Sequence, residues 1–207
     1  SARVAAAACS DIIATQPKLA AAYVVRGNGY VETKEYDRAL IDYSKAIEIE
    51  PRFAAAFLGR GNAYYDQLSF DRAIDDYSRA IEIDPRDALA YNGRGNAYVD
   101  MKDFGRAIAD YNRALELDPR NAFVYNGRGN AYSDTKDYDR AIIDYTQAIQ
   151  LRPNFAWAFA NRGFCYLRRK EHDRALADYN RAIELEPRFS VAYNGRANVY
   201  SDRKEYA

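Results

Sequence analysis

The stretch ALAYNGRGNAYVDMKDFGRAIADYNRALELDPRN, residues 88–121, decides the fold of this chain, because its pattern recurs every 34 residues along the sequence. Proline marks the period most clearly, and all six prolines of the chain obey it. They stand at Pro17, Pro51, Pro85, Pro119, Pro153 and Pro187. A fixed period of about 20–50 residues indicates a repeat architecture, in which one small helical or stranded unit stacks on the next.

Two sets of residues within this stretch have helical spacing. The first is Tyr91, Gly95 and Tyr98, and the second is Ala107, Tyr111 and Ala114. We therefore expect one helix from about Leu89 to Met101 and a second from about Gly105 to Leu117. The second should end before Pro119, because a residue that precedes proline is disfavoured in a helix. Aspartates such as Asp71 and Asp139 stand where an N-cap is wanted.

This order of aromatic, glycine, tyrosine, alanine and proline positions resembles the tetratricopeptide repeat family over essentially the whole chain. One departure is systematic, since an arginine precedes the first-helix glycine where the family often has leucine. The resemblance implies an all-α, right-handed superhelical solenoid of helix-turn-helix units. We expect complete units at 20–53, 54–87, 88–121, 122–155 and 156–189, a second helix alone at 1–19 and a first helix alone at 190–207.

The systematic arginines have a matching series of aspartates just before the second-helix tyrosine. The arginines are Arg26, Arg60, Arg94, Arg128, Arg162 and Arg196, and the aspartates are Asp42, Asp76, Asp110, Asp144 and Asp178. At 100° per residue, Arg94 lies on the edge of the packing face. We predict that the two series pair and are partly buried. The alternative is a basic stripe for phosphate or carboxylate ligands.

Composition excludes several classes of function. Thirty basic and thirty acidic residues are interspersed, which argues against binding of duplex nucleic acid. No uninterrupted apolar run approaches the length of a membrane span, so membrane insertion is not expected. Two cysteines, Cys9 and Cys165, suit neither a disulfide framework nor a zinc site. The RGNAY runs look bacterial, and the compartment, cytoplasmic or exported, stays open because any targeting segment is missing.

No enzyme chemistry is expected, and no cofactor or metal. The Gly-Arg-Gly triplets, such as Gly93 to Gly95, fall in mid-helix without a preceding strand, so they are not phosphate-binding loops. The one histidine, His172, takes the place of an aromatic residue at the turn between helices and has no recurring nucleophile beside it. Eighteen of the nineteen tyrosines, all but Tyr65, fall on packing positions, which favours core packing over base stacking.

A stripe of asparagine and aspartate on the first helices, opposite the packing face, is the predicted groove for a protein or peptide. It comprises Asn28, Asn62, Asn92, Asn96, Asp100, Asn126, Asn130, Asp134, Asn194 and Asn198. Asparagine both donates and accepts hydrogen bonds, as the amides of an extended peptide require. The glycosyltransferase that attaches N-acetylglucosamine to serine and threonine is similar in its asparagine ladder, although there the asparagine lies one residue later.

At that later position this chain has Gly59, Gly93, Gly127 and Gly195. Mid-helix glycine is destabilising, so we read these glycines as a surface that a ligand backbone approaches closely. The alternative reading is that the whole stripe is a solvated face repeated by duplication.

The fifth unit breaks the stripe, because Phe164 and Arg168 replace its asparagine and aspartate. Trp157 lies seven residues before Phe164 and so on the same side of the helix. These three residues, with Arg169, predict a pocket for an apolar or acidic anchor of a partner. A packing repair around Phe155 and Phe159 is the alternative.

Three classes of function remain after these exclusions. The first is a non-catalytic scaffold that binds a peptide or partner protein. The second is head-to-tail self-association through ends that carry no polar capping helix, and the third is the recruiting domain of a larger enzyme. The clamp with which some family members hold the acidic tail of heat-shock chaperones is not expected, because its groove positions carry no lysine here.

Overall fold

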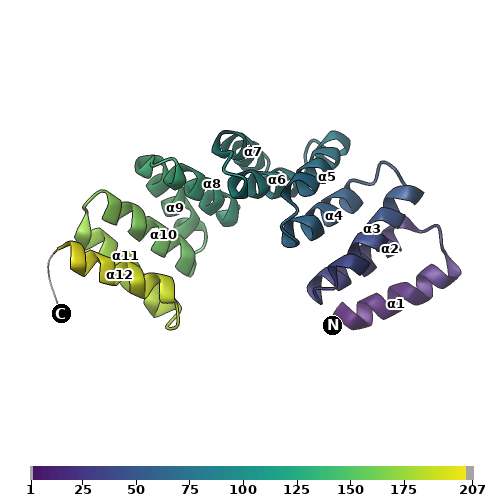
Figure 1. Cartoon of the computed structure of the whole chain (residues 1–207), viewed down its shortest axis with the longest axis horizontal. Helices are drawn as coiled ribbons and strands as arrows, with labels where there is room; N and C mark the ends of the chain where they lie inside the picture. Colours follow the sequence, from purple (N-terminus) through teal and green to yellow (C-terminus); the bar gives the residue numbers. More distant parts are fainter. Residues whose placement is uncertain (1, 204–207) are drawn as a thin grey trace. The chain divides into compact units, whose positions relative to one another are not determined.

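The computed structural model describes residues 2–203, and their side chains apart from those of residues 2–5 and 7. All regular secondary structure in this part of the chain is α-helical (Figure 1), which confirms the predicted all-α class. The helices are α1 Ala2–Thr15, α2 Ala20–Glu32, α3 Tyr36–Ile49, α4 Ala54–Asp66, α5 Phe70–Ile83, α6 Ala88–Asp100, α7 Phe104–Leu117, α8 Ala122–Asp134, α9 Tyr138–Leu151, α10 Ala156–Arg168, α11 His172–Leu185 and α12 Ser190–Asp202.

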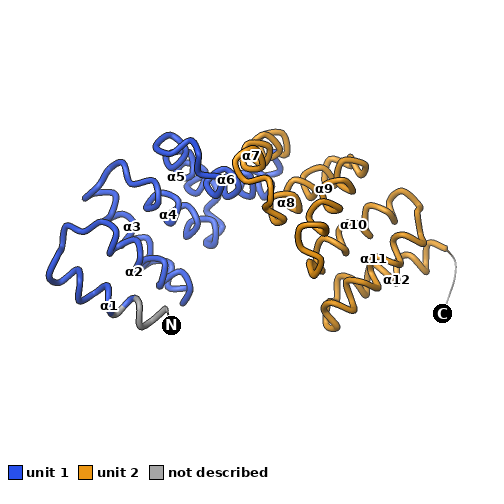
Figure 2. Tube along the Cα trace, turned by 180° about the vertical axis from the view of Figure 1, so that it is seen from behind, with its two compact units in different colours: residues 1–103 blue, residues 104–207 orange. Residues whose placement is uncertain are grey.

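The chain forms two compact units, residues 1–103 with α1–α6 and residues 104–207 with α7–α12 (Figure 2). Inside each unit, every helix packs against the next one in sequence. First helices of neighbouring hairpins also touch, since α2 contacts α4, α4 contacts α6, α8 contacts α10 and α10 contacts α12. Among the described residues, no such contact joins the second helices α3 and α5, or α9 and α11. The first helices therefore form the inner layer of each unit.

A tyrosine from each second helix lies at the centre of the core. Tyr43, Tyr77, Tyr111, Tyr145 and Tyr179 are at most 2% exposed. The alanines four residues before and three residues after each tyrosine are fully buried. Small side chains there let the helices approach until the tyrosine rings fill the space between them. Core packing is thus confirmed for this series of tyrosines.

In residues 88–121, the observed helix boundaries agree with the predicted ones to within one residue. Helix α6 begins at Ala88 and ends at Asp100, one residue earlier at each end than expected. Helix α7 begins at Phe104 and ends at Leu117, two residues before Pro119, as the restriction on residues before proline requires.

The predicted N-caps were wrong. Asp71 and Asp139 lie inside the first turns of α5 and α9, where a carboxylate is favoured by the positive end of the helix dipole. The residues whose side chains accept hydrogen bonds from the first backbone amides are instead Asp87 for α6, Asn121 for α8 and Asp137 for α9.

Candidate functional site

Arginine–aspartate pairs join the two helices of four hairpins, as the sequence predicts. Arg26 Nε and Nη2 donate to Asp42 Oδ2 and Oδ1, each at 2.7 Å. The same two-pronged geometry recurs at Arg60–Asp76, Arg128–Asp144 and Arg162–Asp178. The hydrogen bonds that Asp42 accepts raise the pKa of the Arg26 guanidinium. Because each aspartate is buried, these arginines are engaged inside the fold and do not form a stripe open to ligands.

The core tyrosines explain the mid-helix glycines. A Cβ added to Gly59 would lie 2.5 Å from the ring of Tyr43, and one added to Gly195 would lie 2.3 Å from the ring of Tyr179. Gly93 and Gly127 face Tyr77 and Tyr111 in the same way. Packing therefore accounts for these glycines without a ligand, because the ring of the preceding second helix occupies the space that a side chain would need.

Part of the predicted asparagine stripe binds these same tyrosines. The Tyr43 hydroxyl donates to Asn28 Oδ1 at 2.6 Å, and Tyr77 and Tyr145 donate to Asn62 and Asn130 at 2.8 Å. The Asn161 side chain donates to Asn126 and Asn130, and Asp100 accepts from Tyr65 at 2.6 Å. The stripe is therefore partly a structural network in which the asparagine oxygens are already occupied.

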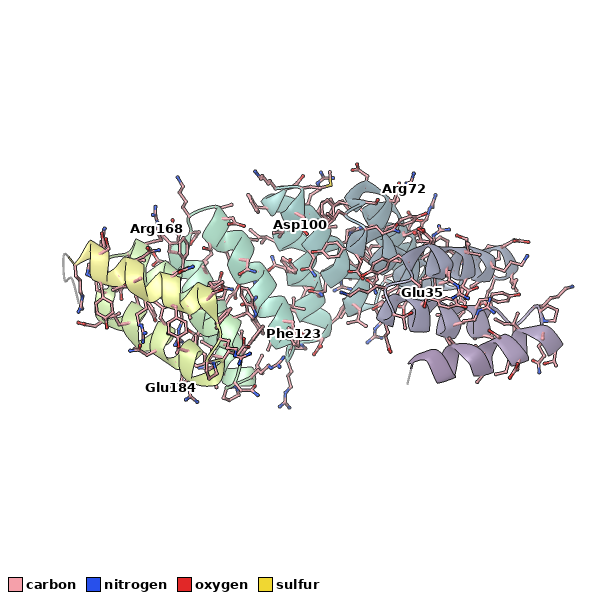
Figure 3. The ribbon with its side chains drawn as sticks, turned by 60° about the horizontal axis from the view of Figure 1, so that its bottom comes forward. Glu35, Arg72, Asp100, Phe123, Arg168 and Glu184 are labelled. Atoms are coloured by element: carbon pink, nitrogen blue, oxygen red, sulfur yellow. The ribbon has the colours of Figure 1, made fainter. Side chains whose placement is uncertain are left out.

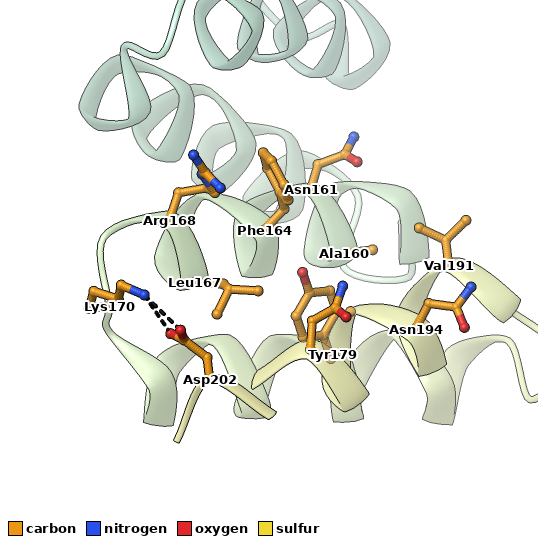
Figure 4. A pocket seen from close by; sticks show the side chains of 12 residues that line it. Ala160, Asn161, Phe164, Leu167, Arg168, Lys170, Tyr179, Val191, Asn194 and Asp202 are labelled. Atoms are coloured by element: carbon orange, nitrogen blue, oxygen red, sulfur yellow. Dashed lines mark hydrogen bonds and ion pairs between the residues drawn. The ribbon is translucent and has the colours of Figure 1, made fainter. Parts of the chain in front are cut away.

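A cavity of about 740 Å³ lies between the first helices α10 and α12 (Figure 4). It brings together four of the predicted site residues, namely Phe164, Arg168, Asn194 and Asn198. The remaining lining residues are Ala160, Asn161, Leu167, Lys170, Tyr179, Val191, Gly195 and Asp202. Lining residues come from α10 and α12, from Tyr179 of α11 between them, and from Lys170 in the turn after α10. This cavity is the candidate functional site.

Tyr179 is one of the lining residues that the sequence did not predict, because its position indicates only core packing. It is 2% exposed and lies between α10 and α12 in Figure 4. Phe164 stands at the sequence position where the partners of Tyr43, Tyr77 and Tyr145 have an asparagine. Within the described residues, the Tyr179 hydroxyl has no hydrogen-bond partner. Burial raises the pKa of Tyr179, so the hydroxyl stays protonated and able to donate.

Charged side chains gather at one end of the cavity. Lys170 Nζ donates to both carboxylate oxygens of Asp202, at 2.7 and 2.8 Å, and His172 Nε2 lies 2.7 Å from Asp202 Oδ2. These contacts, from Lys170 first and then from His172, lower the pKa of Asp202. Arg168 Nε donates to the Tyr138 hydroxyl at 3.3 Å. Among the described residues Arg168 has no acidic partner.

Trp157 does not line this cavity, so the predicted pocket of Trp157, Phe164 and Arg168 is not one site. The Trp157 ring packs edge-on against Phe189, with 4.6 Å between centroids. It lines a second cavity of about 650 Å³ at the turn before α12. Phe164 instead leans edge-on towards Tyr138, at 6.4 Å. Arg169 pairs with Asp139 and Glu171, away from the cavity.

The described residues contain no group of histidine, cysteine, aspartate and glutamate that could hold a metal ion. Cys9 and Cys165 are buried free thiols, and burial raises the pKa of Cys165 to about 11. None of the helices described is long and apolar enough to cross a membrane. Acidic and basic side chains are both distributed over the ribbon (Figure 3), among them Glu35, Arg72, Asp100, Arg168 and Glu184.

Comparisons with known structures place the chain among tetratricopeptide repeat proteins. YrrB, described as a TPR protein with an unusual peptide-binding site, is 24% identical, with a TM-score of 0.73 over 93% of this chain and 99% of YrrB. MamA is 26% identical, with a TM-score of 0.72 over 79% and 96%. PilF of Pseudomonas aeruginosa is 19% identical, with a TM-score of 0.81 over 90% and 85%. A search of curated protein sequences gave no significant match.

Sequence profiles agree with these structural matches. The profile described as "TPR repeat" matches residues 27–68 and 95–136. The profile described as "Tetratricopeptide repeat" matches residues 54–87, 122–155 and 156–189. Together the matched residues make up well over half of the sequence, and the chain therefore belongs to the tetratricopeptide repeat family.

Proposed function

We propose that this chain is a non-catalytic interaction scaffold that binds an extended segment of a partner protein on its first helices, at the cavity between α10 and α12. The fold is typical of protein–protein interaction. The observation that carries the proposal is the composition of the cavity, which combines the exposed Phe164 and Val191 with the exposed amides of Asn194 and Asn198.

Such a lining suits a peptide better than it suits a small metabolite. Asn194 and Asn198 lie one turn apart on α12, and both can donate to and accept from successive backbone amides. The cavity volume of about 740 Å³ has room for a few side chains. YrrB, which shares the fold, is described as having a peptide-binding site.

Selection from a library of random peptides displayed on phage tests the proposal. We expect the chain to enrich peptides that bind it, and the double variant Asn194→Ala/Asn198→Ala to bind them at least about tenfold more weakly, because two amide hydrogen bonds are lost. Ile143→Ala is the matched control, since Ile143 is exposed on the second helix α9. Peptides that bind the double variant as tightly as the unaltered chain would contradict this placement of the site.

Head-to-tail self-association is a second candidate, favoured by one exposed face of α12. Tyr193 is 41% exposed, whereas Phe159, at the same place one repeat earlier, is 9% exposed. Ala197 next to it is exposed as well, while its counterpart Gly163 is buried. Light scattering over a concentration series tests this candidate. We expect the mass to rise with concentration and Tyr193→Asp to prevent the rise, and a constant monomer mass would exclude it.

A further inference from the structure

We infer that the cavity between α10 and α12 selects an acidic peptide segment: Tyr179 donates to an amide carbonyl, Phe164 packs against an apolar side chain, and Arg168 binds a neighbouring carboxylate. This inference rests on the proposed function and adds the chemical class of the ligand. It comes from the one place where the repeated tyrosine–asparagine pair is broken.

The tyrosine hydroxyl indicates an amide ligand. In three other hairpins the equivalent hydroxyl donates to an asparagine oxygen at 2.6–2.8 Å. That acceptor is an amide carbonyl, and a peptide backbone offers the same group. Tyr179 is buried, lines the cavity and has no partner within the described residues. A peptide carbonyl placed above Tyr179 would take the position that the asparagine oxygen occupies elsewhere, and would accept from a hydroxyl that no protein group in the described residues engages.

Phe164 opens the space that this carbonyl needs. It replaces the asparagine, but its ring turns towards Tyr138 of α9 instead of covering the Tyr179 hydroxyl. Phe164 remains 44% exposed, and Val191 across the cavity is also 44% exposed. Two exposed apolar side chains on facing helices favour an apolar residue between them, because that contact removes both from water.

Arg168 supplies the charge. The residue at this place in the repeat is acidic in the other units, as Glu32, Asp66, Asp100, Asp134 and Asp202, and only here is it basic. The cavity lining carries two cations, Arg168 and Lys170, against the single anion Asp202. Lys170 already neutralises Asp202, so the Arg168 charge is left uncompensated. A planar guanidinium at the cavity rim suits a carboxylate.

The order of these groups fixes the order of ligand features. In Figure 4, Arg168 and the Lys170–Asp202 pair lie at one end, Val191 and Asn194 at the other, and Tyr179 and Phe164 between them. The carboxylate of the ligand would therefore lie at the carboxyl-terminal end of α10. The carbonyl would lie at the middle, above Tyr179, and the apolar side chain between Phe164 and Val191, towards the end that carries Asn194.

The test selects one library of random phage-displayed dodecapeptides on the unaltered chain, on Phe164→Asn and on Arg168→Asp. Phe164→Asn restores the tyrosine–asparagine pair of the other hairpins, so it should fold normally while closing the Tyr179 hydroxyl to ligands. We expect the unaltered chain to enrich peptides with an acidic residue near an apolar one. Phe164→Asn should bind these peptides more than about tenfold more weakly, and Arg168→Asp should lose the preference for acidic residues.

Two further variants separate a ligand contact from a structural role. Tyr179→Phe should weaken binding about fivefold to tenfold, whereas Tyr77→Phe, whose hydroxyl bonds Asn62 internally, should leave binding unchanged. Enriched peptides without the acidic and apolar pattern, or equal binding to Phe164→Asn, would overturn this inference and leave the proposed function standing. Failure of the unaltered chain to enrich any peptide would overturn both.

Discussion

At the scale of single residues, five residues other than glycine adopt the left-handed backbone conformation that glycine usually occupies. They are Lys34, Leu68, Lys102, Lys136 and Lys170, with φ between 59° and 64°. Each follows the end of a first helix. At the end of α8, the amide of Lys136 donates to Ser133 O at 2.9 Å and that of Asp137 to Tyr132 O at 2.8 Å. These two hydrogen bonds form the Schellman motif, in which the left-handed residue lets the chain turn sharply into the second helix.

Replacing Lys136 by glycine should stabilise the protein. A residue with a Cβ destabilises the folded state by about 1–2 kcal/mol in the left-handed region. Glycine at the same position destabilises it by about 0.4–1 kcal/mol, because glycine increases the entropy of the unfolded chain. We therefore expect Lys136→Gly to raise the free energy of unfolding by about 0.5–1 kcal/mol, as measured by urea denaturation. Lys136→Ala, which removes the charge and keeps the Cβ, is the control. An equal gain in both variants would assign the effect to charge.

Single residues also determine the effect of the interruption in the asparagine stripe at Phe164 and Arg168. The sequence alone identifies Phe164 and Arg168 as exceptions within a regular series. It does not say that Asn28, Asn62 and Asn130 accept from buried tyrosines, because that contact joins residues on different helices. The consequence of Phe164 for Tyr179 is therefore visible only in three dimensions.

At the scale of helices, the first and second helices of a hairpin are held at a fixed distance by a ring packed against a glycine. A Cβ on Gly129 of α8 would lie 2.7 Å from the ring of Tyr145 of α9, and Tyr145 is only 1% exposed. The ring has no room to move away, because protein interiors are close-packed. The helices would have to separate to admit even a methyl group.

Gly129→Ala should therefore destabilise the protein despite the better helix propensity of alanine. Overpacking costs about 1–3 kcal/mol, and the propensity gain returns at most about 1 kcal/mol, so we expect a net loss of about 1–2 kcal/mol in thermal or urea unfolding. Gly105 of α7, which is exposed, provides the control. Gly105→Ala should stabilise the chain by about 0.5–1 kcal/mol. A neutral or stabilising Gly129→Ala would contradict this account of the packing.

The buried arginine–aspartate pair is the second link between helices. Asp144 is 2% exposed and accepts two hydrogen bonds from Arg128. Arg128→Leu would leave this carboxylate buried without its counter-charge, and we expect a loss of about 3 kcal/mol in the free energy of unfolding. The double variant Arg128→Met/Asp144→Leu should recover most of that loss, because a well-packed apolar pair can replace a buried ion pair. If Arg128→Leu left stability unchanged, the arginine would not have a structural role.

At the scale of the whole chain, the repeat period predicts the all-α class, the approximate helix positions near residues 88–121 and the pairing of arginine with aspartate. These features depend on local periodicity, which the sequence carries directly. The N-caps, the role of the glycines and the separation of Trp157 from Phe164 were wrong or missed. The N-caps depend on the exact residue at which a helix begins, and the other two depend on which aromatic ring packs between two helices. A shift of one or two residues in a helix boundary changes both.

The repeat also places the same titratable group in the core several times, which makes stability sensitive to alkaline pH. Burial raises the pKa of Tyr43, Tyr77, Tyr145 and Tyr179 above the ordinary value. In the unfolded chain these phenols ionise near pH 10, at about their ordinary pKa. The folded state then holds protons that the unfolded state has released, so the stability that these groups provide is complete below about pH 10 and is lost as the pH rises towards their folded pKa.

Each buried tyrosine should lower the free energy of unfolding by about 1.4 kcal/mol for every pH unit above about 10. Four together should unfold the chain within roughly one to three pH units, since domain stabilities are about 5–15 kcal/mol. Urea midpoints measured across this range, with tyrosinate absorbance recorded in parallel, check the expectation. Tyr145→Phe should reduce the slope of stability against pH by about 1.4 kcal/mol per pH unit, in addition to any constant offset from its lost hydrogen bond to Asn130. A slope that does not change in this variant would mean that Tyr145 ionises as readily in the folded chain as in the unfolded one, and that the core admits hydroxide without opening.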